Sequence, residues 1–353
     1  MSNRGRAVAG CLSLILAGAA GPAAAKPKHE ITWLLGHENL DYFEEAAETF
    51  KTAVEAGSNG DIRVRIVPEV RDQRNGLAAP EIAAKVASGE FEMGHSFCDV
   101  IGALDPRFHV FEAPYLFRDY RHLEGVFEGP LGADMLQGLR SHGLVGLSFT
   151  YSGGASGVST AKRELKRLED LKGLKIAVYG APFNEGWLKS VGASAVPIGH
   201  KIREIVPGTK DGEIDGAVIT WRNFQVGTLQ RAHQRYNLPG STYLVSLTYI
   251  NEKFLAGLPE KYRTLIVSAS REAGRIERAK TIQLNEDAKR AMLAEGVRPV
   301  YISEVEQRRV AEAVRPAVES ALGRDFVEKI LSAPNGPEAK VAPEALTSKA
   351  PAP

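Results

Sequence analysis

The residues of this chain that could do chemistry are polar and aromatic side chains standing just after apolar runs. Such runs indicate buried strands, and in open parallel sheets ligands bind beyond the carboxyl ends of the strands. Hydroxyl, amide, imidazole and aromatic groups suit a neutral, zwitterionic or aromatic solute, because rings supply apolar contact area and a few polar groups fix orientation. The candidate ligand-binding residues are His37, Glu38, Asn39, His95, Ser96, Tyr151, Ser156, Tyr179, His200, Trp221 and Arg222.

These residues form no recognisable catalytic set. The sequence has no P-loop, dinucleotide-binding glycine turn, nucleophile elbow, zinc-protease motif or paired Cys-x-x-Cys, and its eight histidines lack metal-ligand spacing. We therefore expect a protein that is not an enzyme, with no catalytic residues, no metal site and no cofactor. A secreted hydrolase that uses His95 or His200 is a minor alternative, because no nucleophile can be paired with a base.

Two series of alternating strands and helices must position the candidate residues. Periodicity predicts strands at 30–35, 61–67 and 91–97 with helices at 43–57 and 80–87 between them. A second series has strands at 174–178, 195–198 and 216–219 and a helix from Phe183 to Gly192. Strands separated by single helices favour parallel pairing, so the fold class is α/β.

The connecting segments are less regular. A strand at 144–151 is predicted to end in a turn at Gly153 and Gly154, residues 105–117 are expected to be mostly loop, and a helix from Ser303 is expected to end before Pro316. Residues 259–296 have helix-forming composition and contain no proline after the first position. They predict one long helix.

Several short strings occur in a characteristic order: SGEFEMG at 88–94, APYLFRD at 113–119, DLKGLKI at 170–176, GASAVPI at 192–198 and LPEKYRTL at 258–265. In that order and spacing the chain resembles the solute-binding proteins of TRAP transporters, the DctP-type family. The resemblance covers about residues 31–331.

The resemblance implies a two-lobed periplasmic-binding-protein fold, type II-like, with a long helix spanning both lobes. Lobe I is expected at 26–152 plus 242–280, and lobe II at 153–241 plus 281–333. The tail at 334–353 is rich in proline, alanine and charge and is predicted to be disordered.

The implied function is a periplasmic subunit that captures a small organic solute between its lobes by hinge closure and delivers it to the TRAP-type membrane permease. Its partners are then the solute and the permease subunits. The alternative is a ligand-sensing or scaffold subunit that serves a periplasmic signalling partner.

Family members grip a substrate carboxylate with arginine, whose planar fork matches the carboxylate. At the two usual places this sequence has Ala177 and Ser156. Either the ligand is not a typical clamp-bound carboxylate, or another cation takes over, for which Arg222, Arg71 and Arg118 are candidates.

Composition and the N-terminus predict the compartment. The formal net charge of +1 comes from interleaved charges and gives no reason to expect nucleic acid or an anionic membrane as partner. Residues 1–25 read as a signal peptide, with Arg4 and Arg6, an apolar run and small residues before Lys26, so we expect export to the periplasm. No other window is apolar enough to insert into a membrane. Cleavage would leave only Cys98, expected to be a buried thiol.

Overall fold

The computed structural model describes residues 26–35, 43–67, 79–180, 183–199 and 201–337. Within these ranges, no helix combines the length and apolar character required to cross a bilayer. The two predicted series of strands and helices are present, and they join through one mixed sheet whose main path runs β2-β1-β3-β9-β4-β7-β5-β6.

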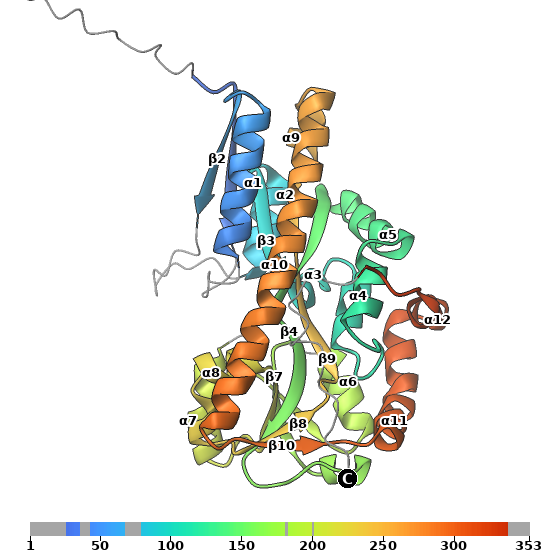
Figure 1. Ribbon diagram of the computed structural model, residues 1–353. Coiled ribbons are helices and arrows are strands. Elements are labelled where there is room, and N and C mark those ends of the chain that lie inside the picture. The colour runs from blue at the N-terminus through green and yellow to red at the C-terminus, as the bar shows by residue number, and fades with distance from the viewer. Residues whose placement is uncertain (1–25, 36–42, 68–78, 181–182, 200, 338–353) are drawn as a thin grey trace, which may run out of the picture.

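The first series forms one end of the sheet (Figure 1). Its strands are β1 (His29–Leu35), β2 (Ile62–Val67) and β3 (Met93–Phe97), and its helices are α1 (Glu44–Gly57) and α2 (Ala79–Ser88). β1 pairs in parallel with both β2 and β3, which confirms the prediction from the alternating pattern. In α1 the buried Phe50 and Val54 lie one helical turn apart, so this helix packs on the sheet by one apolar stripe.

The second series forms the other end. Its strands β5 (Lys175–Val178), β6 (Ser194–Pro197) and β7 (Gly216–Thr220) are parallel, again as predicted. Its helices are α6 (Phe183–Ser190), α7 (Ile205–Lys210) and α8 (Trp221–Val226). Strand β8 (Arg235–Leu238) pairs with β10 (Arg298–Tyr301) and with the end of β4, beside this series.

Two long antiparallel strands connect the ends. β4 (Leu144–Thr160) and β9 (Thr242–Asn251) pair along most of their length, and β9 also pairs with β3 while β4 also pairs with β7. The predicted turn at Gly153 and Gly154 is wrong, because β4 continues through it with a register shift against β9 between Tyr151 and Gly154. Both glycines have positive φ, and a Cβ at Gly153 would lie 2.6 Å from Thr220 Oγ1. The glycine pair therefore makes a bulge instead of a turn.

One helix runs along both ends of the molecule. α10 (Glu260–Ala294) has 35 residues and crosses the long strands, lying beside α1 near its start and α8 near its end (Figure 1). The predicted long helix is confirmed.

Further helices flank these elements. They include α3 (Cys98–Ile101), the 3₁₀ helix η2 (Pro106–Glu112), α4 (Tyr120–Phe127), α5 (Pro130–Gly138), the 3₁₀ helix η3 (Leu139–His142), α11 (Glu304–Leu322) and α12 (Arg324–Ser332), with α9 (Glu252–Gly257) leading into α10.

Two expectations for these segments are corrected. η2 replaces the expected loop, because Asp105 caps its first turn by accepting a hydrogen bond from Arg107 N at 3.0 Å. α11 continues through Pro316, because its apolar face of Val310, Val314 and Val318 is buried on both sides of the proline. Packing of that face outweighs the lost backbone hydrogen bond.

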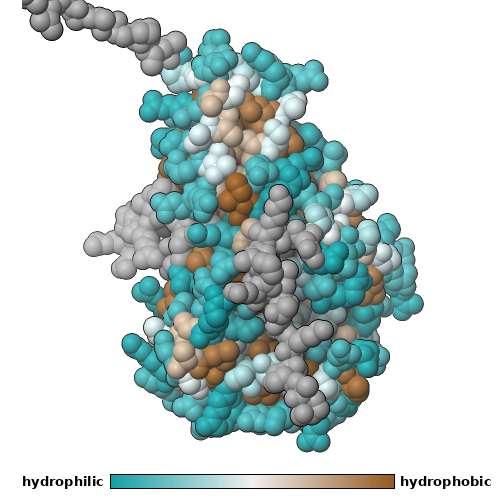
Figure 2. All heavy atoms as spheres, in the orientation of Figure 1, coloured by the Kyte–Doolittle hydropathy of each residue, from teal (hydrophilic) through white to brown (hydrophobic). Residues whose placement is uncertain are grey.

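The surface is mostly hydrophilic, with apolar side chains in small separate groups on the face shown in Figure 2. Cys98 is buried, as predicted, and burial raises the pKa of its thiol well above the ordinary value. A thiol held in that state is a small apolar packing group, not a nucleophile.

Arg278 fastens α10 to the long strands. Its guanidinium donates to Phe149 O at 2.8 Å, to Glu124 Oε1 at 2.8 Å and to Glu128 Oε1 at 2.7 Å. Arg278 and Glu124 are both buried, so each charge depends on the other for compensation. Helix α10, strand β4 and helix α4 are thereby held at one point.

We expect Arg278→Ala to lower the free energy of unfolding by about 3–5 kcal/mol, because it leaves the Glu124 carboxylate buried without its cation. Urea unfolding followed by circular dichroism measures the change. Arg271→Ala is the matched control, since Arg271 is an exposed arginine on the same helix and its loss should change stability by less than about 0.5 kcal/mol. Equal effects of the two substitutions would contradict the assignment.

Candidate functional site

His95 and Ser96 lie inside the crossing of the long strands. His95 Nε2 is 2.9 Å from Thr150 Oγ1, which is 2.8 Å from Ser246 Oγ, and Ser96 Oγ is 2.7 Å from Tyr249 Oη. His95 also packs on Phe43 with a ring-centroid separation of 4.1 Å. Both candidate residues are fully buried, and these hydrogen bonds join β3 to β4 and β9.

Tyr151 belongs to the same crossing, on the side of α10. Its backbone N–H donates to Glu277 Oε2 at 2.6 Å, and its hydroxyl donates to Glu124 Oε1 at 3.2 Å. Thr281 Oγ1 donates to the other Glu277 oxygen at 2.6 Å. Burial raises the pKa of Glu277 to about 8, so this carboxyl is mostly protonated at neutral pH.

Ser156 and Tyr179 line a small cavity between the long strands, the second series and η2. Its free space is about 10 Å³, roughly what one water molecule occupies. Residues from η2, β4, β5, α6, β7 and β9 surround it. The described lining residues are Glu112, Ser156, Val178, Tyr179, Asn184, Val218, Thr242, Tyr243 and Leu244.

Helices α3 and η2 approach the junction of β5 and α6 closely beside this cavity. The His109 ring stacks on the Phe183 ring at 5.7 Å with 4° between their planes. A Cβ at Gly180 would lie 3.0 Å from Asp99 Oδ2, so glycine permits this approach. Helices α3 and η2 therefore contact the β5–α6 junction of the second series directly.

Trp221, Arg222 and Arg118 lie elsewhere. The Trp221 ring stacks on Tyr236 at 3.7 Å in the core of the second series. Arg222 Nη1 donates to Gln225 Oε1 at 3.0 Å, and Arg118 donates to Leu331 O at 3.1 Å and to Ala333 O at 3.2 Å. None of the three is among the described lining residues of the cavity.

The other candidates, His37, Glu38, Asn39, His200 and Arg71, lie outside the described residues. Sequence reasoning missed Glu112, Asn184 and Thr242, which do line the cavity. Glu112 was missed because residues 105–117 carry no strand or helix periodicity. The available signal was a single carboxylate inside the apolar run VFEAPYLF at 110–117.

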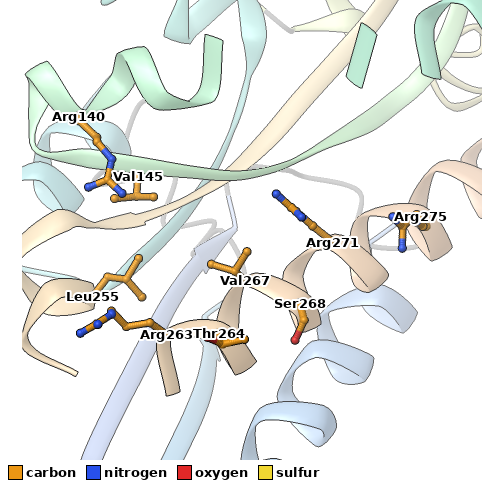
Figure 3. A pocket seen from close by; sticks show the side chains of 9 residues that line it. All are labelled: Arg140, Val145, Leu255, Arg263, Thr264, Val267, Ser268, Arg271 and Arg275. Carbon is orange, nitrogen blue, oxygen red and sulfur yellow. The ribbon is translucent and has the colours of Figure 1, made fainter. Parts of the chain in front are cut away.

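A second hollow lies away from the cavity, along the first half of α10 (Figure 3). It is an open groove of about 560 Å³ between α10, α9, η3 and the start of β4. Its arginines border an apolar floor that includes Val145, Val267 and Leu255. Arg140 is paired with Glu252 at 2.8 Å and Arg275 with Glu128 at 3.2 Å, so part of the positive charge is compensated within the protein.

No group of three or more histidine, cysteine, aspartate or glutamate side chains with the geometry of a metal site occurs in the part of the chain that the structure describes.

The fold has two α/β halves that share crossing strands, one long helix that spans both, and a small cavity with a mixed lining. This is the fold of the two-lobed periplasmic binding proteins. The chain belongs to the bacterial extracellular solute-binding proteins of family 7, DctP, whose family model matches residues 36–325. Members of this family and the neighbouring structures are solute-binding proteins and not enzymes.

Named relatives bind sugar-derived and dicarboxylate solutes. The chain is 26% identical to the 2,3-diketo-L-gulonate-binding periplasmic protein YiaO of Escherichia coli over 66% of this chain and 69% of that protein. It is 25% identical to the C4-dicarboxylate-binding periplasmic protein DctP of Rhodobacter capsulatus over 82% of this chain and 83% of that protein.

Solved structures show the same fold. A TRAP periplasmic solute-binding protein from Ochrobactrum anthropi matches with a TM-score of 0.79 and 22% identity, covering 87% of this chain and 94% of that one. One from Roseobacter denitrificans with bound β-D-glucuronate matches with a TM-score of 0.76 and 20% identity, covering 86% of this chain and all of that one. At these identities the likeness establishes the fold alone.

The state of Glu277 makes stability depend on pH. A carboxyl whose pKa rises from 4.5 to about 8 on folding holds a proton that the unfolded chain has already lost, so its contribution to the free energy of unfolding falls as pH rises between these values. The slope is at most about 1.4 kcal/mol per pH unit. We expect Glu277→Gln to flatten this decline, measured by urea unfolding at pH 5, 6, 7 and 8. Glu272→Gln, at an exposed position of the same helix, is the control and should leave the slope unchanged. Parallel pH profiles for Glu277→Gln and the native protein would contradict the raised pKa of Glu277.

Proposed function

We propose that this protein is the periplasmic receptor of a TRAP-type transporter, and that it delivers to a membrane permease a solute that is not held as an arginine-clamped carboxylate. Lobe I comprises residues 26–152 and 242–280, and lobe II residues 153–241 and 281–333. Residues 1–25 direct export and are removed. The family assignment and the crossing strands support this division, since the bulge in β4 lies at the proposed boundary.

The observation that carries the proposal on the ligand is the lining of the interlobe cavity. Among its described residues, Glu112 has the one formal charge, and no arginine or lysine occurs. Ser156, at one of the two places where the resemblance expects a clamping arginine, lines the cavity itself, and Ala177, at the other, is buried among apolar side chains of the second lobe. The two described candidates for a replacement cation, Arg118 and Arg222, donate to groups away from the cavity.

The remaining lining supports a solute with an apolar or aromatic body. Tyr179, Tyr243 and Leu244 supply apolar walls, while Ser156, Thr242 and Asn184 supply polar atoms that could orient a ligand. Glucuronate and galactonate, which occupy some structures of this fold, carry a carboxylate that these described residues would meet without a counter-charge.

The proposal is tested by measuring the Tm of the chain from Lys26 onward in the presence of each compound of a solute panel. A ligand at a hundredfold excess over its Kd stabilises the native state by about 2.7 kcal/mol, which raises Tm by several degrees. We expect such a rise with neutral, zwitterionic or aromatic compounds and none with glucuronate, galactonate or succinate. A strong rise with those acids would show that a clamp exists.

Deletion of the gene separates transport from signalling. If the protein serves a permease, cells that lack it should lose uptake of the radiolabelled solute identified by the panel, and plasmid-borne protein should restore it. Unchanged uptake together with an altered transcriptional response to the solute would favour a sensory role instead.

A further inference from the structure

Glu112 occupies an unusual place in the interlobe cavity. It is the last residue of η2 in lobe I, and it faces Tyr179 and Asn184 of lobe II across the cavity. Its side chain is only 12% exposed. A carboxylate at such a depth normally has a cation or several hydrogen-bond donors beside it.

The described residues do not supply those donors to both of its oxygens. Glu112 Oε2 is buried and has no hydrogen-bond partner among them, and the nearest cationic candidate, His109 Nδ1, is 3.6 Å away. That separation exceeds hydrogen-bonding distance. One acceptor atom of this cavity-lining carboxylate is therefore left without a hydrogen-bond donor among the described residues.

The surroundings favour a positive charge at this position. Burial raises the pKa of the Glu112 carboxyl, the nearby charge of Asp99 raises it further, and the side chains of His109 and Asn184 oppose the shift. A cation placed in the cavity would reverse the cost of ionising Glu112, because an opposite charge at close range favours the charged carboxylate. A carboxylate placed there would add to the repulsion.

Two hydroxyls complete a polar set around the open acceptor. Ser156 and Thr242 are 2% and 4% exposed and line the same cavity. Each hydroxyl can donate to or accept from a ligand or water atom that enters the cavity. Tyr179 and Tyr243 contribute aromatic surface beside them.

We propose that the solute of this receptor carries a protonated amine or guanidinium, and that Glu112 is its counter-ion. Ser156 and Thr242 accept or donate hydrogen bonds to the same polar end, and the tyrosine rings contact the remainder. The inference rests on the proposed function. In contrast to a carboxylate clamp, the charged side chain of the protein is negative and the solute is positive. In the closed arrangement described here the free space is about 10 Å³, so the solute enters when the lobes separate.

The test compares matched amines and acids by thermal shift and isothermal titration calorimetry. Suitable probes are glucosamine against glucuronate, tyramine against 4-hydroxyphenylacetate, and agmatine, within a library of primary amines, guanidines, amino acids and sugar acids. At least one cationic compound should raise Tm, and its acidic counterpart should not. Binding of neutral or acidic compounds alone would overturn this inference while leaving the receptor function standing; no binding by any compound would count against both.

Glu112→Gln provides the residue-level test. With the cationic compound, its affinity should fall at least about 30-fold, because the buried charge pair loses one partner. Glu213→Gln, an exposed carboxylate with the same change in net charge, should behave as the native protein does.

The ligand-free variant distinguishes recognition from a structural role. Because the carboxyl is costly to ionise where it is buried, Glu112→Gln should raise Tm at pH 8 in the absence of solute. A lower Tm combined with unchanged affinity for the amine would mean that Glu112 supports the fold and does not bind the ligand.

Discussion

The antiparallel pairing of β4 with β9 is the constraint on which the rest of the molecule depends. Each half buries its own apolar clusters, yet both halves hydrogen-bond to these two strands, so their relative position is set where the strands cross. Arg278 and Glu277 of α10 bind the backbone of β4 at Phe149 and Tyr151. The cavity is lined by residues of both long strands, of η2 and of the β5–α6 segment.

The sequence predicted the regular parts of the fold because their causes are local. Apolar periodicity located the β1–α1–β2–α2–β3 series, helix-forming composition without an internal proline located α10, and the order of short strings indicated one family. The failures involve forces that act between segments. The glycine pair at 153 and 154 suggested a turn, but pairing with β9 keeps the strand going; Pro316 suggested a helix end, but the buried valines around it keep α11 intact.

The candidate site was only partly accessible to the same reasoning. Strand ends directed attention to Ser156 and Tyr179, which line the cavity, and to His95 and Ser96, whose side chains contact the crossing strands instead. Glu112 could not be found in this way because a 3₁₀ segment carries it there from a distant part of the chain. Sequence periodicity reports which face of an element is buried, but not which other element meets that face.

The interior of the strand crossing contains serine and threonine where most sheets would place valine or leucine. Ser148, Thr248 and Ser270 lie within 3.0 Å of one another, and Thr150, Ser152 and Ser246 form a second linked group. A hydroxyl can rotate to serve as donor or acceptor, so neighbouring hydroxyls can exchange partners when strands shift by a fraction of an ångström. Interlocked methyl groups would resist such a shift through lost contact. The sheet can therefore bend at the crossing, because the hydroxyls exchange hydrogen-bond partners while the packing of the two strands is kept.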